Sequence, residues 1–226
     1  MTVEITEKNR ELSLFSEYCR LKEKGLRKQA FEKLSDFLIE FQKFSFDQKK
    51  EFTIFIFELI ENEESFDNKY ISHPLSEELK KVLVQWMELE GKNSNPFRWF
   101  GIKFQCWDVE YFNRALEINP ADEKARIYII NIYINRIWNA THHLPDYFIG
   151  NSEDSSRAAE IVKSHIAKLS DTSKQEYFLN RLNQEMILVE NYRNWETEKT
   201  DLDFKAWYKL NNRKFDSGVI AYYYDK

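Results

Sequence analysis

Residues 95–120, NPFRWFGIKFQCWDVEYFNRALEINP, decide the fold of this chain. Asn95 predicts a helix N-cap, and Pro96 suits the first helical position, where a missing amide costs nothing. Aromatic residues then follow at helical spacing, at Phe97, Phe100 and Phe104. Pro120 ends the second apolar pattern, because proline cannot continue a helix. The stretch therefore predicts a helix, a tight corner and a second helix.

The same stretch resembles a tetratricopeptide repeat. The resemblance covers about residues 95–133. The large and small packing positions that carry it are Phe97, Phe100, Gly101, Phe104, Phe112, Ala115, Leu116 and Pro120. It implies stacked antiparallel helix hairpins and a protein-interaction scaffold.

Composition points the same way. Only five Gly and four Pro occur in 226 residues, too few for the turns of an all-β or βαβ fold. We predict an all-α protein of stacked antiparallel helix hairpins, with about nine or ten helices. Residues 1–226 are expected to form a single helical-repeat domain, with a possible sub-division near 63–74 or 91–95.

Apolar periodicity predicts the other helices. The predicted ranges are 8–24, 26–44, 47–62, 74–91, 121–139, 172–199 and 201–212, together with a helix that starts at Ser152. Residues 63–72 are predicted to be a loop, and 141–150 the longest irregular segment. The end of the chain at 221–224 either packs on a neighbouring helix or is loose. Most of the six tryptophans are expected in the core.

Charge separates the classes of possible partner. The net charge of −5 argues against nucleic acid, because phosphate neutralisation needs a basic surface. Residues 20–33 hold six basic side chains against two acids, whereas residues 47–90 hold eleven acids against five lysines. The acidic block is a possible landing site for a basic partner, as in an immunity-type inhibitor. Ordinary solvated helix faces are the alternative.

The cysteines and the apolar runs indicate the compartment. Cys19 and Cys106 stand alone, which suggests neither a disulfide framework nor zinc. No run reaches the 18 to 20 apolar residues that a bilayer span needs, about the length given by bilayer thickness. A cytoplasmic protein without a membrane partner is expected.

The most specific candidate site lies on the helix after Pro120. Five side chains fall within an arc of roughly 80° at 100° per residue. This Asn ladder consists of Tyr128, Asn131, Asn135, Asn139 and His142. Asn both donates and accepts, which suits it to binding the main chain of an extended peptide, and Arg136 can supply a charge to a partner carboxylate. The alternative is that these Asn side chains bond to neighbouring segments or face water.

Signals for catalysis are weak. The sequence has no phosphate-binding glycine loop, no nucleophile elbow and no His-Glu-x-x-His. His142 and His143, with Asp146 nearby, leave a metal-dependent helical enzyme as a minor alternative. We therefore predict no enzyme, no cofactor and no metal, but a protein or peptide partner. His165 is predicted to lie at the edge of the core.

Overall fold

The computed structural model describes residues 10–63 and 66–211, and the predicted end at 221–224 lies outside them. Those residues form helices and no strand, which confirms the all-α prediction. The chain groups into two compact units, Met1–Gln105 and Cys106–Lys226. A single domain and the tetratricopeptide-repeat resemblance both remain predictions; the division between the units follows Gln105, inside the stretch that resembles the repeat.

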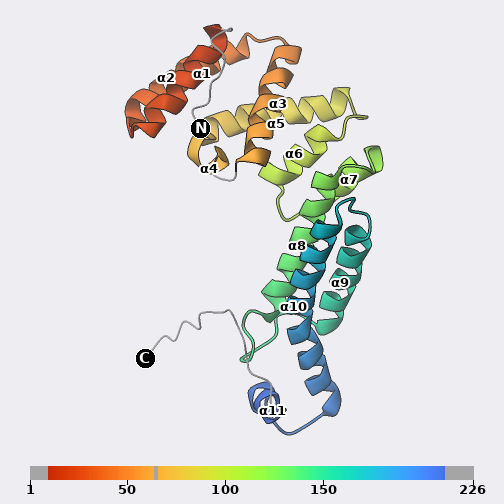
Figure 1. Ribbon diagram of the computed structural model, residues 1–226. Coiled ribbons are helices and arrows are strands. Elements are labelled where there is room, and N and C mark those ends of the chain that lie inside the picture. The colour runs from red at the N-terminus through yellow and green to blue at the C-terminus, as the bar shows by residue number, and fades with distance from the viewer. Residues whose placement is uncertain (1–9, 64–65, 212–226) are drawn as a thin grey trace. The chain divides into compact units, whose positions relative to one another are not determined.

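The first unit contains the helices α1 to α6 (Figure 1). Their bounds are α1 Arg10–Glu23, α2 Arg27–Gln42, α3 Phe46–Asn62, α4 Phe66–Tyr70, α5 His73–Leu89 and α6 Asn95–Phe104. Helices α1 and α2 lie side by side as a hairpin, α5 packs on both α3 and α6, and α4 contacts α1 and α3. Gly25 turns the α1–α2 corner with a φ of 73°, a left-handed conformation that glycine adopts without steric cost.

Aromatic side chains fill the core of the first unit. Phe52 on α3 lies between rings of α1 and α2, with centroids 5.2 Å from Phe15 and 5.0 Å from Phe37. Deeper along α3, Phe57 stacks on Trp99 of α6 at 5.4 Å. Offset and edge-on aromatic pairs of this kind add to the stabilisation that burial gives. The rings therefore pack the α1–α2 hairpin and α6 against different positions along α3.

An ion pair is buried in the same unit. Arg98 Nε donates to Glu61 Oε1 at 2.8 Å, and the two side chains are only 9% and 3% exposed. Trp99 Nε1 donates to the same carboxylate oxygen at 3.1 Å. Since a buried carboxylate is costly without charged partners, this cluster fixes how α6 docks on α3.

The second unit contains the helices α7 to α11 (Figure 1). Their bounds are α7 Glu110–Ile118, α8 Glu123–Thr141, α9 Ser152–Ile166, α10 Thr172–Glu198 and α11 Phe204–Leu210. Helices α8, α9 and α10 lie side by side, α7 packs on α8, and α11 packs on α10. The aliphatic core between α8, α9 and α10 is built from Ile130, Ile134, Ile137, Val162, Ile166, Leu182 and Val189. A smaller cluster joins Leu144, in the turn after α8, to Phe204, Trp207 and Tyr208 of α11.

Helix starts differ from prediction in detail. Helix α3 was predicted to start at Asp47, but Ser45 is its N-cap, because its side chain and that of Gln48 form a reciprocal capping box. Asn95 lies inside α6, after Ser94 in the N-cap position, although Pro96 is near the helix start as predicted. The loop predicted at 63–72 contains the short α4, whose Phe66 and Tyr70 are buried. Burial against α1 and α3 stabilises α4, and the local sequence pattern could not predict this tertiary contact.

His165 gives the second unit a pH-dependent stability. It lies half-buried on α9, with Nδ1 3.5 Å from Nη1 of Arg126. Burial first, and the charge of Arg126 second, lower the pKa of His165 to about 4. The folded protein thus holds a neutral ring, whereas the unfolded chain takes up a proton near pH 6.5, so this contribution to stability is present above pH 6.5 and is lost as the pH falls toward 4.

Replacing His165 with glutamine should therefore flatten the pH dependence of stability. With allowance for partial solvent access, we expect the native protein to lose about 1–2 kcal/mol more than the variant between pH 7 and pH 4. Urea unfolding at several pH values measures this difference. An identical slope in both proteins would contradict a neutral, buried His165.

Candidate partner-binding site

Helix α8 carries every residue of the predicted site except His142, which follows its last residue. Asp122 caps the helix by accepting a hydrogen bond from the amide of Ala125. Neighbours α7, α9 and α10 then bury most of its isoleucines, which leaves one polar arc along the helix. The C-cap is His142, and the chain turns there toward α9.

Two members of the Asn ladder are engaged by α10. Arg181 Nη1 donates to Asn131 Oδ1 at 2.6 Å, and Arg181 Nη2 donates to Asn135 Oδ1 at 2.9 Å. One guanidinium thus bridges successive turns of α8, a geometry that its planar donor fork permits. These two Asn carbonyl oxygens serve helix packing in the structure, although their amide groups can still donate.

Replacing Arg181 with methionine tests this bridge. The variant leaves two half-buried carbonyl oxygens without their charged donor, so we expect a loss of about 1–2 kcal/mol in the free energy of unfolding. Urea unfolding provides the measurement. Arg193 on the same helix is the matched control, because it is exposed and donates one hydrogen bond, to Ser156 Oγ; its change to methionine should cost less than about 0.5 kcal/mol. Equal losses in both variants would show that the fork adds nothing.

The remaining predicted residues lie apart from this bridge. Tyr128 is half-buried and stacks on Phe112 of α7 at 5.3 Å. Arg136 is exposed, donates to the backbone oxygen of Trp107 at 2.8 Å and lies over the ring of Tyr133. Asn139 is also exposed. The first half of the ladder, Tyr128 to Asn135, is therefore built into the unit. The second half consists of the exposed Asn139 and the half-buried His142, and we call it the exposed half.

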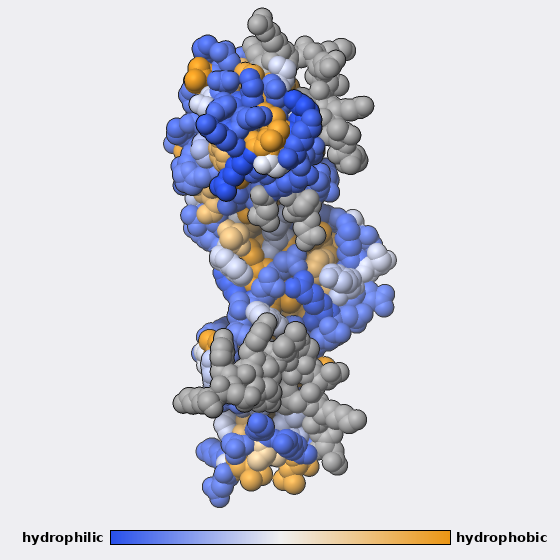
Figure 2. Space-filling view, turned by 90° about the vertical axis from the view of Figure 1, so that its left-hand side faces the viewer, coloured by the Kyte–Doolittle hydropathy of each residue, from blue (hydrophilic) through white to orange (hydrophobic). Residues whose placement is uncertain are grey.

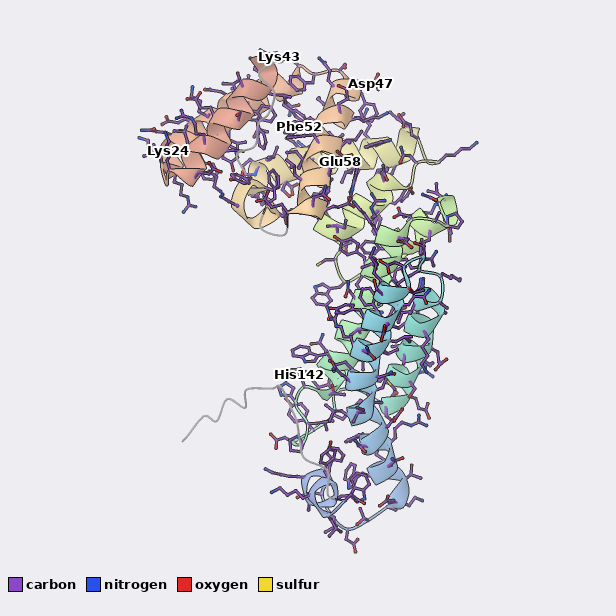
Figure 3. All side chains as sticks on the ribbon, in the orientation of Figure 1. Lys24, Lys43, Asp47, Phe52, Glu58 and His142 are labelled. Carbon is purple, nitrogen blue, oxygen red and sulfur yellow. The ribbon has the colours of Figure 1, made fainter. Side chains whose placement is uncertain are left out.

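Aromatic side chains gather around Asn139, at the end of α8. Trp138 stacks on His142 at 4.7 Å, His142 lies 4.0 Å from His143, and His143 stacks on Tyr147 at 4.6 Å. We call these four side chains the aromatic strip. Trp138 is 45% exposed and Tyr147 is 53% exposed. Figure 3 shows His142 at the end of α8, on the side away from α9.

Local structure holds the aromatic strip in place. The ring nitrogen Nδ1 of His142 lies 2.8 Å from the backbone oxygen of Asn139, which fixes the imidazole against its own helix. Leu144 is buried in the α11 cluster and anchors the turn between His143 and Tyr147. The buried Leu144 and the hydrogen bond of His142 therefore hold the aromatic strip in place, while Trp138 and Tyr147 remain about half exposed to solvent.

Sequence reasoning placed His142 in the Asn ladder and His143 in the minor metal-dependent alternative, but it proposed neither Trp138 nor Tyr147 as a site residue. Trp138 was expected in the core with most tryptophans, yet it and Trp107 are exposed. The sequence could have indicated Trp138, because it lies four residues before His142 and at the edge of the Asn-ladder arc. The part played by Tyr147 depends on the turn after α8, whose path the local sequence does not determine.

Several acids of the block at 47–90 are engaged within the first unit. Glu61 pairs with Arg98, and Asp67 accepts from Lys103 at 2.5 Å. Further ties involve Glu78 with Lys81 and Gln42, and Glu90 with Lys50 and Trp86. These contacts occupy four of the acids, while Glu51, Glu58, Glu77 and Glu88 are exposed.

Within residues 10–63 and 66–211, no three His, Cys, Asp or Glu side chains are grouped so that they could hold a metal ion. The helices of the described segments also include none with the length and apolar character needed to cross a membrane. The fold and this surface define an all-α protein with an ordered, solvent-facing aromatic strip. Comparisons with protein-family models, curated proteins and solved structures found no match.

Proposed function

We propose that this protein is a non-enzymatic, cytoplasmic scaffold that binds a peptide or protein partner through the aromatic strip and the exposed half of the Asn ladder. One observation carries the proposal: three consecutive ring contacts hold Trp138 and Tyr147 in fixed positions while about half of each side chain faces water. Large aromatic side chains supply much of the binding energy at interfaces, because they bury a large area with few rotatable bonds.

The polar neighbours suit the main chain of such a partner. Asn139 can donate to a peptide carbonyl and accept from a peptide amide, and Arg136 can pair with a carboxylate. This arrangement places an apolar anchor beside groups that fix orientation, as is typical of interface centres with polar rims. The immunity-type inhibitor is the second candidate, because Glu61, Asp67, Glu78 and Glu90 of its acidic block are paired within the unit.

Quantitative affinity capture tests the proposal. Wild-type protein and a Trp138→Ser, Tyr147→Ser variant are immobilised and exposed to lysate of the source cells. We expect at least one protein to bind the wild type and to be lost with the variant. The control is a Tyr177→Ser, Ile187→Ser variant, which changes two similarly exposed side chains on α10. Identical capture by all three would rule out the aromatic strip as the binding surface.

A further inference from the structure

The α1–α2 corner of the first unit gathers basic side chains around an exposed leucine. Six cations belong to this basic corner: Arg20, Lys22, Lys24, Arg27, Lys28 and Lys69. Five are close in sequence, and α4 brings the sixth, because Lys69 Nζ lies 3.5 Å from Glu23 Oε1 at the end of α1. Glu23 is the only acid between residues 20 and 28, and it also accepts a hydrogen bond from Tyr70.

The corner is shaped as a projecting end. Figure 3 shows Lys24 at the tip of the α1–α2 hairpin. Leu26, directly after the Gly25 turn, is 42% exposed. Figure 2 looks onto this side of the molecule and shows small hydrophobic areas enclosed by hydrophilic surface on this unit. An exposed leucine beside Lys24, Arg27 and Lys28 at a projecting end can contact a flat surface together with these cations.

Four of the six cations have no acidic partner among the described residues, whereas Arg20 pairs with Glu17 at 3.6 Å and Lys69 pairs with Glu23. No hydrogen bond or ion pair within the described residues holds the amino group of Lys24 or Lys28. Arg27 lies over the ring of Phe31 and Lys22 over that of Tyr18, each at 5.8 Å, so aromatic faces support these side chains without neutralising them. The corner therefore keeps a strong local positive charge on a chain whose net charge is −5.

We propose that the basic corner docks this protein on the surface of an anionic lipid bilayer. Clusters of four to eight Lys and Arg side chains bind the negative cytoplasmic leaflet, with about 1 kcal/mol from each cation near the surface. Leu26 adds a shallow apolar insertion at the centre. Among the described side chains the corner shows no exposed aromatic ring for base stacking, which favours lipid over single-stranded nucleic acid.

This inference is independent of the aromatic strip, which belongs to the other unit. It differs from the sequence-based expectation of no membrane partner, which rested on the lack of a spanning segment. Peripheral binding needs no such segment, because the contact is electrostatic and shallow.

Vesicle co-sedimentation tests the proposal with the full chain. Vesicles of phosphatidylcholine alone are compared with vesicles that contain phosphatidylserine. We expect binding only to the second kind, weakened by added salt because screening shortens the reach of the cations. A Lys24→Gln, Arg27→Gln, Lys28→Gln variant should bind at least about tenfold more weakly. All three side chains are exposed, so the change leaves the core intact.

Two further variants separate the corner from net charge and from a protein partner. Lys168→Gln, Lys205→Gln, Lys209→Gln removes the same charge from exposed sites of the second unit and should leave vesicle binding unchanged. Leu26→Ser should weaken vesicle binding about threefold or more but should not affect binding to polyglutamate. Equal binding to both vesicle types, full binding by the corner variant, or tighter binding to polyglutamate than to vesicles would overturn the proposal; the last result would point to an acidic protein instead.

Discussion

Replacing Arg98 with methionine is expected to lower the free energy of unfolding by about 3–5 kcal/mol. The substitution keeps a long apolar side chain on α6 but removes the charge that faces Glu61 at 2.8 Å. The carboxylate then stays buried at 3% exposure with the indole N–H of Trp99 as a remaining donor. Urea unfolding followed by circular dichroism gives the change in stability.

Two comparisons isolate the cause. Adding Glu61→Gln to the Arg98→Met variant removes the stranded charge and should restore most of the lost stability. The pair of Lys103 and Asp67 is the matched control, because both side chains are more exposed, and Lys103→Met should cost about 1 kcal/mol or less. If Arg98→Met lowers the free energy of unfolding no more than Lys103→Met does, the buried Arg98–Glu61 pair is not what stabilises α6 on α3.

The second large effect concerns the partner. Changing both Trp138 and Tyr147 to serine should weaken binding of the captured partner at least about 30-fold, since a loss of about 1 kcal/mol at each interface anchor already gives that factor. His142→Ala should weaken binding less, because the His142 ring is half-buried and acts by stacking on Trp138. Titration calorimetry or biolayer interferometry measures these affinities.

The control for this effect is again the Tyr177→Ser, Ile187→Ser variant, which should bind normally. Asn131→Ala and Asn135→Ala distinguish the two halves of the Asn ladder. Their carbonyl oxygens accept from Arg181, so these variants should lose stability more than affinity. The opposite outcome, with stability kept and binding lost, would move the binding surface to the first half of the ladder.

Local patterns were enough to predict the helices. Aromatic and aliphatic residues at spacings of three and four gave α2, α5, α8 and α10 to within a few residues. The short α4 was missed because its five residues are stabilised by packing on α1 and α3, not by their own sequence. The start of α3 was misplaced because Ser45, just before the predicted start, supplies the capping side chain.

The candidate site was predictable only in outline. The spacing from Asn131 to His142 predicted that these side chains share one side of α8, because the fixed rotation per residue of a helix sets the direction of each side chain. It could not show that Arg181, 46 residues beyond Asn135, occupies two of the Asn oxygens. The same limit applies to Lys69 at the basic corner and to Tyr147 in the aromatic strip, since all three are placed by tertiary contacts.

Site-specific photo-crosslinking tests the central claim most directly. p-Benzoylphenylalanine replaces Tyr147 in one protein and Tyr177 in another, two tyrosines with 53% and 59% exposure in the same unit. Both proteins are irradiated in cells. The aromatic strip predicts a covalent product with the partner from position 147 and none from position 177. Crosslinks from position 177 alone, or equal products from both positions, would contradict it.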